Sequence, residues 1–486
     1  MELEIRNSFC KLTGDVPPEV SDLVKRVLTY RNDIDAELAA LFPKLNYAKR
    51  SNNNKMYHML LGQIKKLKES EWVCWFNDNE FPTGHLNIVR EVLKSVGAAY
   101  REVDYRVAPT NDLILNWYSK PHELRYYQKE MVELGVKEGR GVFVASVGAG
   151  KSVVLAYILK ELSVRSLIIV PSVGLGLQLE QDFKKWFGPG KVETITTKNV
   201  RKGKKLLPIR IVTIQTLASL QKSEELQNLV EDVNALFCDE VHHSAANSYT
   251  NLLPEIDHIY YRFGFSGSFV RSGSDSLDMW GFLSNVLYRY PAFKAIEEGF
   301  LTPIQIEVHS LPGQRSPSYP KEYEKNYCGG EYLLRKIREI CELAGDSEQI
   351  LILVKNKEKS GNIIHEYLKT YGVDNSYISG DDSKEVVNGT IKAFNEKQVR
   401  VLIGSSVIGE GIDVRSTDQL IMAQGGKSEV VIVQAVGRAV RLYEGKKVAR
   451  VHDFNFIGTK YLKKHLEQRK NIYSRNFECP ILEVED

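Results

Sequence analysis

Three short segments of the chain carry residue types that could bind a polyphosphate and cleave it. Residues 145–152 read ASVGAGKS, residues 239–243 read DEVHH and residues 434–441 read QAVGRAVR. The first segment combines glycines with a lysine and a hydroxyl, the second has two adjacent carboxylates, and the third has two arginines. In this order they predict a phosphate cradle, a site for Mg²⁺ and the attacking water, and cations that neutralise phosphoryl charge.

The first segment lies between an apolar strand pattern and a helical pattern that begins at Val153. Gly148 and Gly150 let successive backbone N–H groups turn towards phosphate oxygens, and the following helix N-terminus adds partial positive charge. Lys151 is expected to reach the β and γ phosphates of ATP, and Ser152 to hold Mg²⁺. An ordinary Gly-Lys-Ser turn is the alternative, but the strand before it and the helix after it favour phosphate binding.

The second segment ends a buried strand pattern, Ala235–Cys238, and so places two carboxylates at the carboxyl edge of a parallel sheet. Asp239 is expected to hold Mg²⁺ through water, and Glu240 to orient and deprotonate the water that attacks the γ phosphate. An exposed acidic turn is the alternative. A zinc site at the two histidines lacks a third ligand, so His242 is interpreted as a polar relay towards the neighbouring domain.

The third segment places Gln434, Arg438 and Arg441 at spacings of four and three, which predicts one face of a helix. We expect Gln434 to face the nucleotide and the two arginines to reach the transferred phosphoryl group from a second domain. Such a finger raises the rate by about 10³ to 10⁵. A solvated helix face is the alternative.

Because these three segments occur in this order, the chain resembles superfamily 2 helicases of the DExH kind. The resemblance covers residues from about 120 to about 455. Residues 124–128, LRYYQ, resemble the segment in which a glutamine contacts adenine. The resemblance therefore implies that Gln128 contacts the base, with Arg125 or Tyr126 beside it.

Further helicase motifs follow in the family's order: PSVGLGLQ at 171–178, VTIQTL at 212–217, FSGS at 265–268 and GSSVIGEGID at 404–413. The resemblance implies that the first two motifs, and the start of the fourth, contact the nucleic-acid backbone. It also implies that the third motif couples the nucleotide to the nucleic acid and that the end of the fourth contacts the nucleotide. The implied residues are Ser172, Thr213, Thr216 and Ser405 for nucleic acid, Ser266 and Ser268 for coupling, and Gly411 and Asp413 for nucleotide.

Composition sets bounds on this interpretation. The 486 residues predict about three domains, and 43% hydrophobic residues suffice for several cores. A net charge of +3 means that any nucleic-acid binding must come from local patches. Six scattered cysteines without a Cys-x-x-Cys pair predict free thiols in a reducing cytoplasm, the host's if the protein is viral. No apolar run predicts a membrane span, and no signal-peptide pattern begins the chain.

We expect an α/β architecture: two tandem RecA-like lobes with parallel sheets, preceded by a small α+β amino-terminal accessory domain. Continuous apolar runs at 167–170, 351–354 and 401–404 are typical of parallel strands covered on both faces. The predicted units are residues 1–115, an accessory nucleic-acid-binding domain; 116–305, the ATP-binding lobe; 306–324, a linker; and 325–486, the second lobe.

The accessory domain contains seven Lys or Arg residues and no acid between Lys44 and Lys68, interleaved with aromatic residues. Basic side chains neutralise phosphates and aromatic rings stack on bases, so Lys49, Arg50 and Lys55 are predicted DNA contacts. A solvated, lysine-rich loop and helix is the alternative. A second basic segment, Lys198–Arg210, could extend the same track.

The basic segment, with FPTGHL at 81–86 and DYR at 104–106, resembles the accessory domain of phage UvsW-like helicases, which remodel branched DNA in recombination, repair and replication. The resemblance implies an ATP- and Mg²⁺-dependent DNA helicase acting on branched or forked DNA. An RNA helicase and an ATP-switched nucleic-acid clamp remain alternatives. A restriction-type motor subunit is disfavoured because no nuclease motif is present. A basic stretch, Lys460–Arg475, is interpreted as a capping helix or a further DNA contact.

Overall fold

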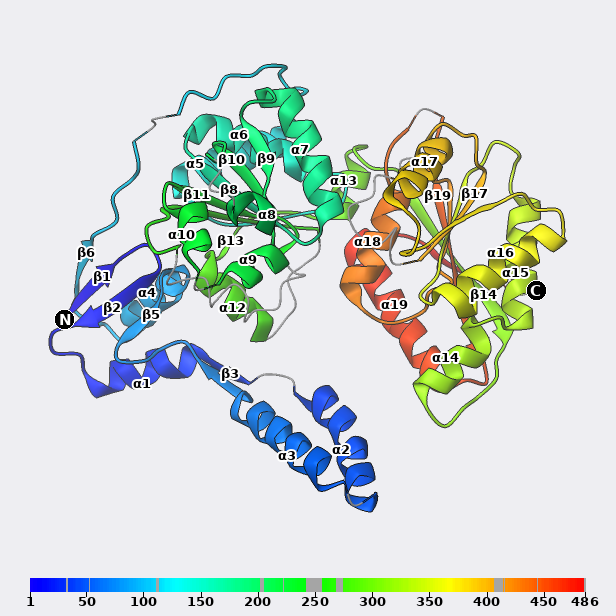
Figure 1. Cartoon of the computed structure of the whole chain (residues 1–486), viewed down its shortest axis with the longest axis horizontal. Coiled ribbons are helices and arrows are strands. Elements are labelled where there is room, and N and C mark those ends of the chain that lie inside the picture. The colour runs from blue at the N-terminus through cyan, green and yellow to red at the C-terminus, as the bar shows by residue number, and fades with distance from the viewer. Residues whose placement is uncertain are drawn as a thin grey trace.

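The computed structural model contains two α/β lobes and an amino-terminal domain that packs on the outer flank of the first lobe (Figure 1). It describes the chain except for residues 32–33, 52, 111–112, 202–204, 222, 242–255, 268–273, 406–413, 415, 444 and 485–486. No helix in the described part is both long and apolar enough to cross a membrane. All six cysteines are free thiols, as their spacing predicted.

The amino-terminal domain is a small α+β unit, as expected. Its four-stranded sheet has the order β5-β2-β1-β6, with β1 antiparallel to β2 and parallel to β6. Alternating apolar residues such as Leu3, Ile5 and Leu12 point from the sheet into a core shared with two helices. The elements are β1 (Glu2–Ile5), β2 (Phe9–Thr13), α1 (Pro18–Val27), β5 (Glu80–Pro82), the short η1 (Thr83–His85), α4 (Leu86–Ser95) and β6 (Arg101–Asp104).

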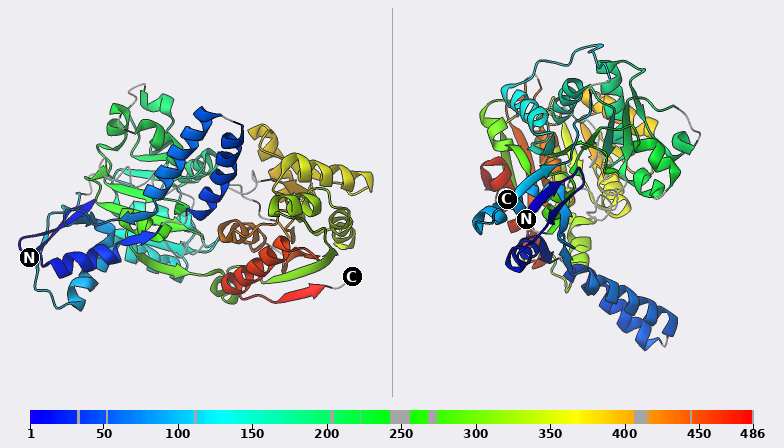
Figure 2. Two further views of the ribbon diagram at one scale, coloured as in Figure 1. Left: turned by 90° about the horizontal axis from the view of Figure 1, so that it is seen from below. Right: turned by 90° about the vertical axis from the view of Figure 1, so that its left-hand side faces the viewer.

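A helical hairpin projects from this domain, and Figure 1 and the right-hand view of Figure 2 show it standing away from the body. Its base is a two-stranded ribbon, in which Tyr30 pairs with Val73. Asn53 caps the second helix, where its side chain accepts a hydrogen bond from the Met56 N–H at 3.1 Å. The basic segment therefore forms two packed helices rather than a loop and a helix. The elements are β3 (Thr29–Arg31), α2 (Asp35–Arg50), α3 (Asn54–Glu69) and β4 (Trp72–Cys74).

The first lobe contains a seven-stranded parallel sheet with the order β13-β7-β12-β11-β8-β10-β9. Its inner strands are buried along their whole length because helices cover both faces, which explains their continuous apolar sequences. The strands are β7 (Arg140–Ala145), β8 (Ser166–Val170), β9 (Val192–Thr194), β10 (Ile209–Thr213), β11 (Ala235–Cys238), β12 (Tyr261–Ser266) and β13 (Val286–Tyr290). The helices are α5 (Tyr126–Glu138), α6 (Lys151–Leu162), α7 (Val173–Phe187), α8 (Thr197–Arg201), α9 (Ile214–Leu220), α10 (Glu224–Val230), α12 (Ser274–Phe282) and α13 (Ala292–Glu297).

The second lobe repeats this architecture, with a seven-stranded parallel sheet in the order β16-β17-β15-β18-β19-β14-β20. The two sheets confirm the expected pair of RecA-like lobes. The strands are β14 (Ile304–Pro312), β15 (Ile350–Leu353), β16 (Ser376–Ile378), β17 (Val401–Gly404), β18 (Gln419–Ile421), β19 (Ala449–Ile457) and β20 (Ile481–Val484). The helices are α14 (Tyr319–Tyr327), α15 (Glu331–Leu343), the π-helix η4 (Lys357–Asn362), α16 (Ile363–Thr370), α17 (Lys384–Asn395), α18 (Glu429–Ala439) and α19 (Tyr461–Phe477).

The structure differs from the linker predicted at 306–324. That segment begins inside β14, which pairs with β19 along nine residues, and ends in α14. Alternating buried residues, among them Ile306 and Val308, make β14 an internal strand of the second sheet. The turn-rich sequence GQRSPSYP at 313–320, which suggested a linker, lies after this strand. The chain therefore enters the second lobe earlier than predicted.

The basic carboxyl-terminal stretch forms α19, which packs on the second sheet. Arg469 is buried and forms a two-pronged ion pair with Asp453, at 2.7 and 2.8 Å, while Tyr473 donates to the same carboxylate at 2.9 Å. A buried charge is tolerated only when it is paired in this way. Arg469 therefore holds the helix on the sheet and is not exposed to DNA.

The accessory domain is joined to the first lobe by buried polar contacts at α12. The Asp278 carboxylate, on α12, accepts hydrogen bonds from Trp75 Nε1 at 2.7 Å and from the Tyr30 hydroxyl. Nearby, a Cβ on Gly84 would lie 1.7 Å from the Trp280 carbonyl oxygen, so only glycine permits this approach. Because Tyr30 and Trp75 come from the two legs of the hairpin base, Asp278 fixes the hairpin to the first lobe.

Candidate functional site

The predicted phosphate loop connects β7 to α6 at the carboxyl edge of the first sheet. Gly148 and Gly150 have φ angles of 83° and 80°, in the left-handed region that glycine adopts without strain. Lys151 is the first residue of α6, and its ammonium donates to the Ala145 carbonyl at 3.3 Å. The loop thus has the bend, the helix N-terminus and the inward lysine that phosphate binding requires.

Two side chains of α5 hold this loop by hydrogen bonds to its backbone. Tyr127 and Gln128 are fully buried and donate to the same carbonyl, that of Ala149, at 3.0 and 2.8 Å. The Gln128 amide oxygen accepts from the Arg125 N–H at 2.9 Å. In the structure Gln128 therefore lies under the phosphate loop, while the adenine contact of Gln128 and Arg125 stays a prediction.

The two predicted carboxylates follow β11, beside the phosphate loop. Glu240 Oε1 lies 3.5 Å from Lys151 Nζ. Burial, together with the adjacent charge of Glu240, raises the pKa of Asp239 to about 7. Glu240 has a φ angle of 49°, which is uncommon for a residue with a side chain and is a form of strain found at functional sites. The site concentrates negative charge that a cation would relieve.

The predicted coupling segment, residues 265–268, lies beside Lys151 and Glu240. It begins with the last two residues of β12, of which Ser266 is fully buried. The Gly267 N–H donates to Glu240 Oε2 at 3.3 Å, and a Cβ on Gly267 would lie 3.2 Å from Lys151 Nζ. The backbone of this segment therefore donates to the carboxylate and leaves no room for a side chain beside the lysine, and α12 follows the segment in the chain.

The second lobe reaches the phosphate loop through α18. A Cβ on Gly437 would lie 2.6 Å from the Val147 Cβ, so the helix packs directly against the loop. Arg438 is 6% exposed; burial lowers its pKa to about 10, and the charge of Glu240 acts in the opposite direction. A guanidinium from the second lobe thus lies within electrostatic reach of the carboxylate in the first lobe.

Arg441 is not on the helix that the spacing predicted. The helix α18 ends at Ala439, so Arg441 lies in the segment that follows. Its side chain still faces the phosphate loop, since a Cβ on Gly148 would lie 3.9 Å from Arg441 Cγ. The Thr302 N–H donates to the Val440 carbonyl at 2.8 Å, which turns the chain after the helix back towards the first lobe.

Three residues predicted to contact nucleic acid, Ser172, Thr213 and Thr216, lie at or just beyond the ends of two parallel strands, β8 and β10. Ser172 and Thr213 cap α7 and α9, where their hydroxyl oxygens accept from the Leu175 and Thr216 N–H groups at 3.3 and 3.2 Å. Thr216 also shares a hydrogen bond of 3.0 Å with the Thr213 hydroxyl. Since β8 and β10 are neighbours, both capped helix starts lie at one edge of the first sheet.

Ser405 follows β17 in the second lobe and lines a cavity of about 620 Å³ at the carboxyl edge of that sheet. Gln434 and Arg438 line the same cavity from α18, and Lys355 lines it from the end of β15. Three of the residues predicted for this lobe, Ser405, Gln434 and Arg438, therefore line one cavity.

The predicted DNA contacts of the accessory domain lie on the hairpin. All seven basic residues of the segment are exposed: Lys44, Lys49, Arg50, Lys55, Lys65, Lys66 and Lys68. Two aromatic side chains of α2 are exposed among them, Phe42 at 45% and Tyr47 at 67%. The hairpin thus presents cationic and aromatic groups on a projecting element.

Four further residues with predicted roles, His242, Ser268, Gly411 and Asp413, lie outside the described residues.

Sequence reasoning missed several residues that build this site. Tyr127 gave no signal of its own beside Gln128, although its hydroxyl holds the phosphate loop. Gly437 lies within an ordinary helical pattern, and its role in the close packing of the two lobes depends on Val147, which is in the other lobe. Asp278 lacked a signal because its partners, Tyr30 and Trp75, are more than 200 residues away.

Both lobes match known sequence families. Residues 121–271 match the family described as Type III restriction enzyme, res subunit, and residues 334–443 match the helicase conserved C-terminal domain. The ATP-dependent DNA helicase uvsW of Enterobacteria phage T4 is 25% identical over 361 residues, which cover 69% of each chain. The DNA 3'-5' translocase XPB2 of Sulfurisphaera tokodaii is 24% identical over 365 residues, covering 66% of this chain and 79% of that protein.

Comparison with solved structures supports the same fold. Dbp5 of S. cerevisiae, bound to RNA and ADP BeF3, superimposes with a TM-score of 0.54 at 15% identity, covering 74% of this chain and 89% of Dbp5. At this identity the likeness concerns the two-lobed fold alone.

Proposed function

We propose that this superfamily 2 helicase remodels branched DNA, using ATP to move along one strand while its helical hairpin contacts the branch. The chain is a nucleic-acid-dependent ATPase of the helicase class, since its two lobes match helicase-type families in order. The feature that carries the choice of branched DNA is the exposed basic and aromatic hairpin, anchored through Asp278 to the lobe that contains the phosphate loop.

ATP would bind between the lobes, with its phosphates on the loop after β7 and Lys151 at the β and γ phosphates. The residues present fit Mg²⁺, because Ser152 follows the lysine and Asp239 is a buried carboxylate beside a second carboxylate. Mg²⁺ held by Ser152 and Asp239 would neutralise charge on the β and γ phosphates. Glu240 then orients the attacking water, and its hydrogen bond from Gly267 fixes the carboxylate for this role.

Closure of the lobes would place both arginines at the nucleotide. Arg438 contributes positive charge from α18, and Arg441 contributes it from the segment after this helix. Since α18 packs on Val147 of the phosphate loop, a change in the phosphates is passed directly to the second lobe. Gln434 lies on the same helix, beside the cavity that contains Ser405.

Translocation would result from alternate grips of the two lobes on one strand. Ser172, Thr213 and Thr216 lie at one edge of the first sheet, and Ser405 lies at the corresponding edge of the second. Hydroxyls and N–H groups at strand and helix ends contact backbone phosphates, which carry no sequence information. The motor would therefore move along DNA without base preference.

The first test reverses charge on the hairpin. The variant Lys49→Glu/Arg50→Glu/Lys55→Glu should weaken binding to forked DNA by more than 10-fold and reduce the salt dependence of binding by about two to three released counterions. Basal ATP hydrolysis should change less than twofold, since these side chains are on the projecting hairpin. Fluorescence anisotropy at several salt concentrations and a coupled ATPase assay measure the two quantities.

A matched variant, Lys129→Glu/Lys137→Glu/Lys369→Glu, makes the same charge change at exposed lysines of α5 and α16. It should leave fork binding close to that of the wild type. Equal weakening by both variants would mean that only net charge matters, and the hairpin would lose its assigned role.

A second prediction concerns the hairpin anchor. Asp278→Leu removes the carboxylate that accepts from Tyr30 and Trp75. Loss of the hydrogen bond to the buried Tyr30 hydroxyl should cost about 1 to 3 kcal/mol, and loss of the bond to the half-buried Trp75 should cost less. We expect limited proteolysis to cleave the accessory domain faster, and forked DNA to stimulate the ATPase less than in the wild type. Unchanged stimulation by forks would show that the anchor does not couple the hairpin to the motor.

A further inference from the structure

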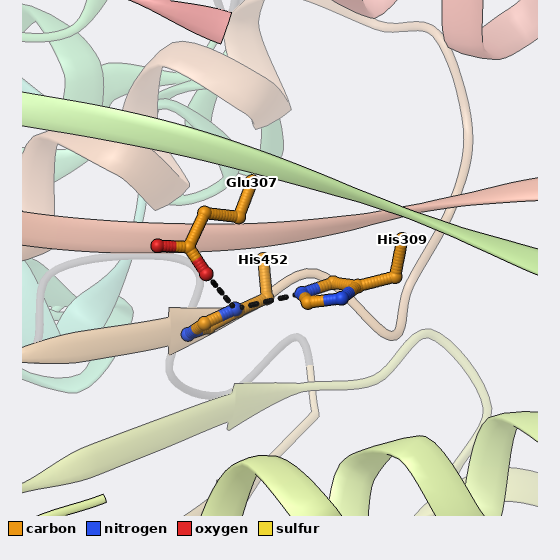
Figure 3. Close-up of side chains that lie close together, drawn as sticks. All are labelled: Glu307, His309 and His452. Atoms are coloured by element: carbon orange, nitrogen blue, oxygen red, sulfur yellow. Dashed lines mark hydrogen bonds and ion pairs between the residues drawn. The ribbon is translucent and has the colours of Figure 1, made fainter. Parts of the chain in front are cut away.

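Two histidines and a glutamate meet on the second sheet, away from the predicted ATP site. Glu307 and His309 are on β14, and His452 is on the neighbouring strand β19, where it pairs with Glu307. Residues two apart on a strand face the same side, so all three side chains lie on one face of the sheet. Figure 3 shows Nδ1 of His452 between the Glu307 carboxylate and the His309 ring.

The spacing of the three groups suits a cation. His452 Nδ1 lies 3.0 Å from His309 Nε2 and 3.4 Å from Glu307 Oε2, and the three ligand atoms are all within 4.8 Å of one another. A metal about 2.0 to 2.2 Å from each ligand separates neighbouring ligands by about 3.0 Å at right angles and about 3.4 Å at tetrahedral angles. The distances from His452 Nδ1 to the other two ligand atoms lie in this range.

Outer hydrogen bonds orient two of the ligands. Gln419 Nε2 donates to Glu348 Oε2 at 2.7 Å, which leaves Gln419 Oε1 to accept from His452 Nε2 at 2.9 Å. This arrangement favours the His452 tautomer with its proton on Nε2, so the lone pair of Nδ1 faces Glu307 and His309. Gln305 Nε2 likewise donates to Glu307 Oε1 at 2.9 Å and leaves Oε2 facing His452. Metal-binding side chains in proteins are held by such second contacts.

A cation would also remove an unfavourable contact. With Nε2 protonated, His452 turns a lone pair towards both the carboxylate oxygen of Glu307 and Nε2 of His309. The His309 N–H satisfies one of these approaches, but two acceptors then face each other across 3.4 Å. A divalent ion between them accepts electron pairs from all three ligands when the neutral His309 ring adopts the tautomer with its proton on Nδ1, which frees Nε2 for the ion.

We propose that Glu307, His309 and His452 bind one divalent transition-metal cation of the zinc class, with water completing its coordination. Two imidazoles and a carboxylate are a ligand set that Zn²⁺ takes in proteins. The two histidines are 5% and 4% exposed, while the Glu307 side chain is 19% exposed and gives access from solvent. The ion would join β14 to β19 and stabilise the second lobe.

Metal titration of the full chain tests this proposal directly. After treatment with a chelator and dialysis, the wild type should take up one Zn²⁺ per chain in calorimetry and by mass spectrometry of the metal. Co²⁺ at the same site should give visible absorption that differs from that of the hydrated ion. A wild type that binds no Zn²⁺ with this stoichiometry, or a Co²⁺ spectrum identical to that of the free ion, would overturn the site.

Variants assign the ligands. His452→Gln and Glu307→Gln should each weaken Zn²⁺ binding at least about 100-fold, and Gln419→Leu, which acts through His452, about 10- to 100-fold. His365→Gln changes a histidine on α16 in the same lobe and should bind Zn²⁺ as the wild type does. Circular dichroism checks folding of each variant. Wild-type affinity in a folded His452→Gln or Glu307→Gln protein contradicts the assignment.

Discussion

Lys151→Ala should lower the DNA-stimulated ATPase rate by about 10³-fold or more. The lysine is the first residue of α6, and its ammonium lies 3.5 Å from Glu240 Oε1, where the γ phosphate is proposed to react. A fixed donor aimed at developing charge contributes about 10² to 10³ in rate, and Lys151 also carries a full positive charge. A coupled assay with saturating DNA and ATP measures the loss.

Glu240→Gln is the informative control for this prediction. The amide keeps the size of the carboxylate but cannot accept the proton of the attacking water. Turnover should fall strongly, while nucleotide binding is retained and the DNA-bound state persists longer. ATP turnover near the wild-type rate in either variant would contradict the assignment of the phosphate site.

Arg438→Ala should lower single-turnover ATP hydrolysis by about 10³- to 10⁵-fold, the range for arginines that act on a transferred phosphoryl group. Arg438 comes from the second lobe, is buried, and is close enough to Glu240 for that charge to influence its pKa. Its loss removes positive charge from the reacting phosphate when the lobes close. ATP binding, measured by fluorescent-nucleotide displacement, should weaken much less than the rate.

The matched control is Arg475→Ala, which removes an exposed arginine of α19 that pairs with Glu429. This variant should hydrolyse ATP at the wild-type rate. If Arg438→Ala weakened ATP binding as much as hydrolysis, the arginine would act in binding and not in the reaction.

The fold followed from sequence wherever local pattern and burial agree. Continuous apolar runs predicted strands that the structure places at β8, β15 and β17, because parallel strands covered on both faces tolerate few polar residues. Glycines in the 145–152 segment predicted a turn, and Gly148 and Gly150 have the positive φ angles that such a turn needs. These signals lie within a few neighbouring residues.

The differences arise where long-range contacts decide the structure. The spacing of Gln434, Arg438 and Arg441 predicted one helix that includes Arg441. The helix instead ends at Ala439, and the Val440 carbonyl that follows accepts a hydrogen bond from the Thr302 N–H. Most of the strand β14 was assigned to a linker because a turn-rich sequence follows it, and its partner, β19, is about 145 residues further along, where no local pattern shows the pairing. Asp278 and Gly437 gave no local sign of their contacts with distant elements.

Composition predicted the chemical character of the hairpin but not its position. The basic, aromatic-rich segment was visible in the sequence, and the structure exposes all its cationic side chains on two helices. Its direction and its anchor on α12 could not be foreseen, because they depend on the packing of Tyr30 and Trp75 against the first lobe.

Strand conversion tests the proposed function most directly. The wild type, the hairpin variant Lys49→Glu/Arg50→Glu/Lys55→Glu and Lys151→Ala are compared on a mobile four-way junction, a fork and a linear duplex, with ATP and Mg²⁺. We predict that the wild type converts the junction and the fork but hardly affects the linear duplex, that the hairpin variant loses most of this conversion, and that Lys151→Ala converts nothing. A wild type that leaves both branched DNAs intact while RNA stimulates its ATPase would contradict the assignment to branched DNA.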